Sequence, residues 1–193
     1  MSNDLGKFKL DAEKAVLVVI DVQERLVPAM PEDVYLRLRN TVAMLVEVAG
    51  LLGLPVVTTE QYPKGIGHTV PELAAACNET VIEKVSFGCC GEATFLEALK
   101  NTGRTQVLIT GMEAHVCVYQ TVLGLLEDGY YVHLIRDAIC SRNKMDYLAG
   151  VANAGQAGAV VTTAETVMFQ MLQESTHEQF RAVSKLVKER GGA

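Results

Sequence analysis

Three residues with complementary chemistry occur where strand-like segments of the sequence end. Asp21 ends the apolar run "AVLVVID", Lys84 lies near the end of "TVIEKV", and Cys117 lies in "TGMEAHVCV", directly after "QVLIT". A carboxylate can accept a proton, an ammonium group can stabilise negative charge, and a thiolate can attack an electrophilic carbon. The three residues would suit nucleophilic catalysis if the fold brings them together.

Each of the three residues also has a structural interpretation when it is taken alone. Asp21 could cap the turn "DVQERL", and Lys84 could be an exposed charge at the end of a strand. Cys117, between Val116 and Val118, could be a small buried hydrophobic residue. The combination favours function, because three complementary groups at three strand ends are unexpected in a purely structural set.

The apolar pattern predicts alternating strands and helices. Continuous apolar or β-branched runs indicate strands at 15–21, 55–60, 80–85, 106–110, 130–135 and 159–163. Apolar spacings of three and four indicate helices at 33–52, 92–103, 119–129, 145–155 and 165–190. This alternation predicts an α/β fold, Rossmann-like and doubly wound, with a mainly parallel six-stranded sheet and helices on both faces. Because no internal linker or repeat interrupts the pattern, we expect a single domain over residues 1–193.

Folds of this kind bind ligands beyond the carboxyl ends of their strands, near the point where the strand order reverses. We therefore expect Asp21, Lys84 and Cys117 to meet at one edge of the sheet. The long loop "QYPKGIGHTVPEL" reaches the same edge and carries Tyr62, while Phe87 follows Lys84. On position alone, Tyr62 and Phe87 are the aromatic candidates for binding a substrate.

Three motifs resemble those of the isochorismatase-like cysteine hydrolase superfamily, and the resemblance covers residues 14–173. The motifs are "VLVVIDVQ", "VIEKVSFG" and "GMEAHVCV", and the segment "TTEQYPKGIGHTVPEL" resembles the isochorismatase-domain-containing branch. The resemblance implies a catalytic triad of Asp21, Lys84 and Cys117. It also implies a cis peptide bond between Met112 and Glu113, and an oxyanion hole formed by the backbone amides of Glu113 and Cys117.

The chemistry of the three residues can be argued independently of the resemblance. A thiol in the first turn of a helix and near Lys84 should have a pKa below its usual value of about 8.5, although the charge of Asp21 opposes this effect. We predict that Asp21 is the general base, that Lys84 keeps Asp21 ionised, and that Cys117 is the nucleophile. The expected function is a cysteine-dependent hydrolase of a small carbonyl compound, with an amide or related C–N bond favoured, through a thioester acyl-enzyme.

We expect no metal ion and no other cofactor. Amidases of the nicotinamidase type carry an Asp and several His residues after the second strand, whereas this chain has Glu60, Gln61 and His68 there. A site made by Glu60, His68 and His115 would need three separated segments to meet. Isochorismatase itself does not use a cysteine at the nucleophile position, so Cys117 argues against isochorismate as the substrate.

His115 and the remaining cysteines carry less information. His115 stands where many relatives have Asp or Asn, and both a contact with substrate and a capping role stay open. Cys89 and Cys90 should border the site, and packing is favoured over a redox role. Cys77 and Cys140 belong to no motif.

Composition narrows the class of partner. The net charge of −6 argues against nucleic acid, which needs a concentrated basic surface. No apolar run is long enough to span a membrane, and the five cysteines suit a reducing compartment, so we expect a cytoplasmic protein. We also expect a homo-oligomer that acts on a small molecule.

The alternative function is that of a catalytically silent member that binds a small ligand or serves as an oligomeric scaffold. Phosphoryl transfer from Asp21 is disfavoured, because "DVQER" lacks a second Asp two residues on.

Overall fold

Six strands form one sheet, and every neighbouring pair runs parallel in the order β3-β2-β1-β4-β5-β6. The structure is a computed structural model that describes residues 5–77 and 79–190. The strands are β1 (Ala15–Ile20), β2 (Val56–Gln61), β3 (Val81–Lys84), β4 (Gln106–Met112), β5 (Tyr131–Cys140) and β6 (Val160–Thr162). The predicted doubly wound α/β fold is confirmed, with a sheet that is entirely parallel.

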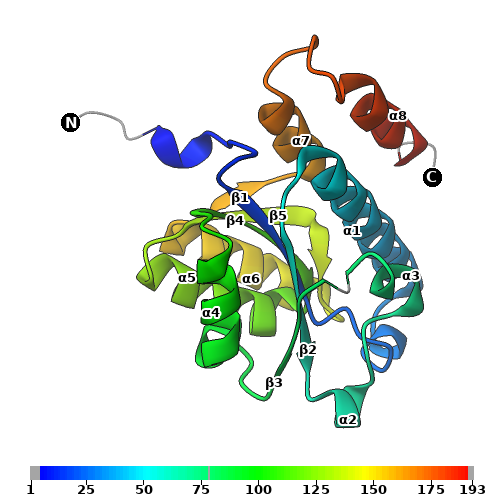
Figure 1. Ribbon diagram of the computed structural model, residues 1–193. Coiled ribbons are helices and arrows are strands. Elements are labelled where there is room, and N and C mark those ends of the chain that lie inside the picture. Colours follow the sequence, from blue (N-terminus) through cyan, green and yellow to red (C-terminus); the bar gives the residue numbers. More distant parts are fainter. Residues whose placement is uncertain (1–4, 78, 191–193) are drawn as a thin grey trace.

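Helices cover both faces of the sheet (Figure 1). One face carries α1 (Glu32–Leu52), α3 (Pro71–Ala74), α7 (Ala164–Leu172) and α8 (Phe180–Arg190). The other face carries α4 (Ala93–Asn101), α5 (Tyr119–Glu127) and α6 (Lys144–Ala157), and α2 (Pro63–Ile66) lies beyond the end of β2. No helix in the described ranges is both long and apolar enough to cross a membrane.

The central strand β1 explains why its sequence is apolar at every position. All six of its residues are buried. Leu17 and Val19 join the core under α1 and α7, whereas Val16, Val18 and Ile20 join the core under α4 and α5. Side chains alternate between the two faces of a strand, so a strand covered on both sides must be apolar throughout. Burial of each such side chain contributes about 1.5–3 kcal/mol to folding.

The carboxyl end of β1 is held close to β4 by a glycine. Gly111 has φ of 116°, and a Cβ atom there would lie 2.0 Å from the carbonyl oxygen of Ile20. Only glycine fits this close approach. The strand order reverses between these two strands, so Gly111 brings the end of β1 against the turn that follows β4.

Two predicted elements differ from the structure. The helix expected at 165–190 is divided into α7 and α8, because α7 ends at Leu172 and the next residue, Gln173, has a φ of 63°. The polar segment "QESTHEQ" after α7 offers no apolar face to bury. Strand β5 continues past the predicted residue 135 to Cys140, since a register shift lets its last residues pair with Gly111 and Met112.

Candidate active site

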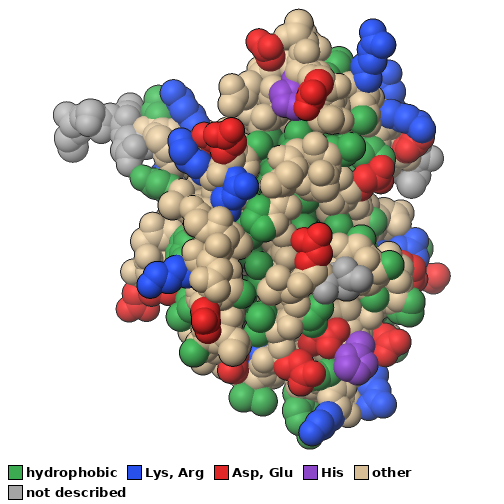
Figure 2. All heavy atoms as spheres, in the orientation of Figure 1, with side chains coloured by type: hydrophobic (Ala, Val, Ile, Leu, Met, Phe, Trp, Pro, Cys, Tyr) green, Lys and Arg blue, Asp and Glu red, His purple; other side chains and the backbone are tan. Residues whose placement is uncertain are grey.

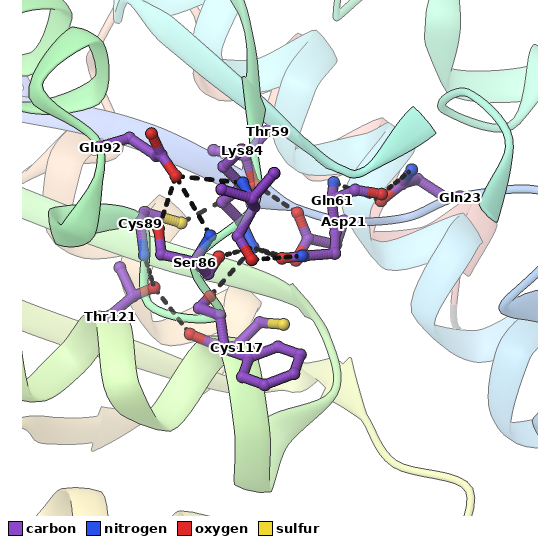
Figure 3. A network of polar contacts seen from close by, with 12 residues as sticks. Asp21, Gln23, Thr59, Gln61, Lys84, Ser86, Cys89, Glu92, Cys117 and Thr121 are labelled. Carbon is purple, nitrogen blue, oxygen red and sulfur yellow. Dashed lines mark hydrogen bonds and ion pairs between the residues drawn. The ribbon is translucent and has the colours of Figure 1, made fainter. Parts of the chain in front are cut away.

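Asp21 and Lys84 form a buried ion pair at the carboxyl edge of the sheet (Figure 3). Lys84 Nζ lies 2.7 Å from Asp21 Oδ2, and neither side chain is exposed. Asp21 follows β1 and Lys84 ends β3, so the whole width of β2 separates the two backbones. Neighbouring strands are about 4.8 Å apart, so β1 and β3 are two such spacings apart, and the long lysine side chain reaches across β2 to the carboxylate.

The Lys84 ammonium group is surrounded by acceptors. It donates to Gln61 Oε1 at 2.7 Å, to the carbonyl oxygen of Ser86 at 3.2 Å and to that of Phe87 at 2.9 Å. A buried charge is tolerated only where it is paired and its donors are satisfied. The surrounding loop and strand therefore hold the ammonium group at one point beside Asp21.

The Asp21 carboxylate uses its two oxygens differently. Thr59 donates from Oγ1 to Asp21 Oδ1 at 2.7 Å, and the backbone amide of Asp21 donates to the carbonyl oxygen of Thr59 at 3.1 Å. Asp21 Oδ2 contacts Lys84. Because a carboxylate oxygen has two lone pairs, Oδ2 retains the capacity to accept a proton from a neighbouring group.

That neighbouring group is the thiol of Cys117. Cys117 lies in η4 (Ala114–Val118), a turn of π-helix that leads into α5, and it is 7% exposed. Burial raises the pKa of this thiol to about 12; the charge of Asp21 adds to the effect, Lys84 opposes it, and a hydrogen bond to Asp21 raises the pKa further. The predicted lowering of this pKa is therefore wrong, since desolvation exceeds the help from Lys84. The resting group is a thiol next to a carboxylate.

The turn before Cys117 contains the expected cis peptide bond between Met112 and Glu113. Arg142 donates to the Glu113 carboxylate from its backbone amide at 3.0 Å and from Nε at 3.1 Å, and its Nη2 lies 2.7 Å from Glu113 Oε1. Burial acts to raise the pKa of Glu113, but the hydrogen bonds from Arg142 outweigh it and hold the pKa below its usual value. The Glu113 side chain thus anchors the turn, and the oxyanion hole at its backbone stays a prediction.

His115 contacts the start of α6. Its Nδ1 lies 3.0 Å from Ser141 Oγ, and its Nε2 lies 3.9 Å from Asp146 Oδ2. These contacts connect η4, termed the nucleophile turn for the role predicted for Cys117, to the residues around α6. A contact with substrate stays a prediction for His115.

The aromatic candidates flank Lys84 through their backbones. Tyr62 donates its amide to the carbonyl oxygen of Lys84 at 2.8 Å, and Phe87 accepts from the Lys84 ammonium group at 2.9 Å. Their side chains are 54% and 55% exposed respectively, and Val85 between Lys84 and Phe87 is 75% exposed. Both rings therefore lie at the solvent rim of the site, and substrate binding by them stays a prediction.

Glu60 and His68 are brought together, but in a network that holds the loop after β2. Glu60 Oε1 accepts from the amide of Thr69 at 2.6 Å and from its hydroxyl at 2.8 Å, while Glu60 Oε2 lies 2.9 Å from His68 Nδ1. Among the residues that the structure describes, no three His, Cys, Asp or Glu side chains gather as metal ligands would. The metal-free site stays a prediction.

Sequence reasoning missed three residues that support the ion pair: Thr59, Gln61 and Gln23. Gln23 is fully buried and accepts from the amide of Gln61 at 2.7 Å, while its Nε2 donates to the carbonyl oxygens of Gln61 and Gly67. The available signal was the polar end of β2, "TTEQ", because buried polar residues at a strand end need partners.

Two hollows of the surface are lined by other residues than Asp21, Lys84 and Cys117. A hollow of about 1010 Å³ is lined mainly by residues of α1, β5, α6 and α8, together with Ser141 and Arg142 between β5 and α6, and one of about 570 Å³ lies beside residues 6–14. Neither is lined by Asp21, Lys84 or Cys117. The candidate site is thus known from its buried residues Asp21, Lys84 and Cys117, and neither of these two hollows defines it.

Residues 15–166 match the family model described as the isochorismatase domain. The chain belongs to the isochorismatase family. It is 34% identical to isochorismatase family protein 1B of Dictyostelium discoideum over 98% of this chain and 93% of that protein. A structure described as MAR1 ribonuclease from Caenorhabditis elegans is 35% identical, with a TM-score of 0.87, and covers 93% of this chain and 92% of its own.

A second solved structure of this isochorismatase-family fold holds a covalent ligand. It is described as YcaC from Pseudomonas aeruginosa with hexane-2,5-diol and covalent acrylamide. It is 25% identical to this chain, with a TM-score of 0.83, and covers 95% of this chain and 97% of its own.

Proposed function

We propose that this isochorismatase-family protein is a cysteine-dependent hydrolase of a small carbonyl compound, with an amide or related C–N bond as the target. The observation that carries the proposal is the buried Asp21–Lys84 ion pair beside the protonated thiol of Cys117. Asp21 is the general base, Cys117 is the nucleophile, and Lys84 keeps Asp21 ionised.

The first half of the reaction forms an acyl-enzyme. Because the pKa of Cys117 is raised to about 12, free thiolate is scarce, and Asp21 takes the thiol proton as sulfur attacks the carbonyl carbon. A C–S bond forms, and the backbone amides of Glu113 and Cys117 stabilise the oxyanion. The C–N bond then breaks, the proton on Asp21 passes to the departing amine, and a thioester remains.

The second half of the reaction releases the acid. Asp21, again a carboxylate, takes a proton from water as the water oxygen attacks the thioester carbonyl. The C–S bond breaks, the Cys117 sulfur recovers the proton from Asp21, and a carboxylic acid leaves. Lys84 takes no part in these proton transfers, so the charge of the pair returns to its starting value.

Several features favour a small substrate. Cys117 is only 7% exposed, which limits the size of a molecule that can reach its thiol, and we propose Tyr62, Phe87 and His115 as the substrate contacts. The covalent acrylamide in YcaC supports reaction of this fold with small electrophiles. No cofactor enters the proposed chemistry, because the chain supplies the base, the nucleophile and the oxyanion donors.

A small molecule is favoured over RNA, although one relative is described as a ribonuclease. The chain has a net charge of −6. On the face drawn in Figure 2, Lys and Arg side chains are scattered among acidic ones instead of forming a continuous basic surface. Nucleic-acid binding depends on such a surface.

The proposal includes a cytoplasmic homo-oligomer. Free cysteines at Cys77, Cys89, Cys90, Cys117 and Cys140 suit a reducing compartment. Exposed apolar side chains, among them Val85, Phe87 and Met145, supply surface for contact between subunits. Light scattering after size exclusion would show a mass above the 20.9 kDa of one chain.

The decisive experiment is a screen of small amides with mass detection of the intact protein and of released acid. We expect one amide to acylate the protein at Cys117 and to be turned over, and Cys117→Ala to lose both signals. Ligand binding with neither adduct nor product would instead support the silent scaffold. Cleavage of RNA by the wild type but not by Cys117→Ala would replace the amide with a nucleic-acid substrate.

A further inference from the structure

The buried thiol of Cys89 and the hydroxyl group of Thr59 lie near the Asp21 carboxylate (Figure 3). Cys89 begins the short helix η3 (Cys89–Gly91) and is fully buried. Its Sγ lies 3.8 Å from Thr59 Oγ1, which in turn lies 2.7 Å from Asp21 Oδ1. The proposed reaction uses neither Cys89 nor Thr59.

The direction of these hydrogen bonds follows from the chemistry of the groups. An ionised carboxylate only accepts, so the single proton of the Thr59 hydroxyl must point to Asp21. The lone pairs of that hydroxyl then remain for the thiol proton of Cys89. The chain of donors therefore runs from Cys89 to Thr59 to Asp21, and each member is fully buried.

The state of Cys89 fits the role of a donor. Burial raises the pKa of this thiol to about 11, and the charge of Asp21 adds to the effect. Cys89 consequently keeps its proton and donates, which a thiolate could not do.

The same loop is tied to the nucleophile turn. The amide of Cys89 donates to Thr121 Oγ1 at 2.9 Å, and that hydroxyl donates to the carbonyl oxygen of Cys117 at 2.7 Å. One side chain of α5 thus positions the end of the donor chain and the nucleophile relative to each other.

We infer that Thr59 and Cys89 are positioning residues for the base. Thr59 donates to Asp21 Oδ1, and Cys89 donates to the Thr59 hydroxyl, so its proton stays directed at the carboxylate. The two residues thereby favour the ionised carboxylate and leave Oδ2 for Lys84 and for the proton of Cys117. This inference rests on the proposed function, because it takes Asp21 as the base. The titratable groups around Asp21 are Lys84 from β3, Cys89 from η3 and Cys117 from η4.

The test measures the rate at which acrylamide alkylates Cys117 as a function of pH, with peptide mass mapping, so it needs no substrate. When acid protonates the Asp21 carboxylate, Asp21 can no longer take the thiol proton of Cys117, and the rate of labelling falls. This fall at low pH is the acid limb of the profile. Loss of one hydrogen bond to the carboxylate makes Asp21 easier to protonate. For Thr59→Val we expect the acid limb to move to higher pH, so that labelling at a fixed pH on this limb is about tenfold slower than in the wild type.

Three further variants separate positioning from structure. Thr59→Ser restores the hydroxyl and should restore the wild-type profile. Thr58→Val is the matched control. Thr58 precedes Thr59 in β2, and its fully buried side chain points to the opposite face of the sheet, so this variant should leave the profile unchanged. Cys89→Ala should move the acid limb in the same direction as Thr59→Val, by a smaller amount.

The outcomes distinguish this inference from the proposed function. Superimposed profiles for the wild type and folded Thr59→Val, with an acid limb that Asp21→Asn removes, would overturn the inference alone. If Thr59→Val does not fold, a Cys89→Ala profile that matches the wild-type profile would overturn the inference. A wild-type profile that Asp21→Asn leaves unaltered would instead overturn Asp21 as the base, and with it the proposed function.

Discussion

Gly150 of α6 packs directly against the backbone of Ala114 in the nucleophile turn: a Cβ atom at Gly150 would lie 2.7 Å from the carbonyl oxygen of Ala114. That oxygen belongs to the backbone, so it cannot move aside as a flexible side chain could. The distance between α6 and the turn that carries Cys117 is therefore set by the absence of a side chain at one position.

Gly150→Ala should displace the nucleophile turn. We expect slower alkylation of Cys117, about tenfold or more, since small displacements of a reacting group have large effects on rate. Gly50→Ala in α1 is the matched control, because a Cβ there meets nothing within 4 Å, and it should gain about 0.5–1 kcal/mol in stability. Equal labelling of Gly150→Ala and the wild type would show that the turn tolerates the shift.

Asp21→Asn should reduce turnover by at least the ~10²-fold typical of the loss of a general base. The variant should be less stable, because the buried Lys84 ammonium group loses its charged partner, but the hydrogen bonds of Lys84 to Gln61 and to two carbonyl oxygens should keep it folded. Steady-state kinetics on the amide found in the screen, with circular dichroism as the check on folding, measures the effect. Wild-type turnover in the folded variant would remove Asp21 from the mechanism.

Cys117 should be the first of the buried cysteines to react with limiting iodoacetamide, ahead of Cys77 and Cys140. Burial raises the pKa of all three thiols, but only Cys117 has Asp21 beside it to take the proton. In Asp21→Asn no carboxylate takes the thiol proton, so the reaction depends on free thiolate. The rate of labelling should then keep rising with pH above 9. Peptide mapping that finds Cys77 or Cys140 labelled first would contradict the assignment.

Arg142→Gln should destabilise the fold by about 1–3 kcal/mol at neutral pH, because it leaves the buried Glu113 carboxylate without its main partner. Since Arg142 holds the folded pKa of Glu113 below its unfolded value of about 4.3, this stability is present above that pH and is lost as the pH falls through the folded pKa. Urea unfolding of both proteins at pH 7 and near pH 3 should therefore show a difference that shrinks in acid. A constant difference would mean that Arg142 acts through packing.

Activity should not depend on a metal ion. Glu60 and His68 are engaged with each other and with Thr69, and a zinc or iron site needs about three converging ligands. Elemental analysis, together with an assay after exhaustive chelation, measures this directly. Stoichiometric zinc, iron or manganese that restores lost activity would overturn the metal-free chemistry.

The fold was accessible from the sequence because its signals are local. A strand buried on both faces has to be apolar at every position, as in β1, and an amphipathic helix has to repeat its apolar residues, as in α1. The bond between Met112 and Glu113 was expected from the family resemblance and is cis in the structure. The order of strands then places Asp21, Lys84 and Cys117 at one edge of the sheet.

The electrostatics of the site depended on tertiary structure alone. The sequence identified Lys84 and the helix start as influences that lower the pKa of Cys117, but it contained no measure of burial, which has the larger and opposite effect. Lys84 was expected beside Asp21, but the other contacts were hidden, because Thr59, Cys89 and Arg142 lie 29 or more positions away in the chain from the groups they contact. Residue types and their order determined which groups could react; packing across strands decided which of them are desolvated, paired and held in place.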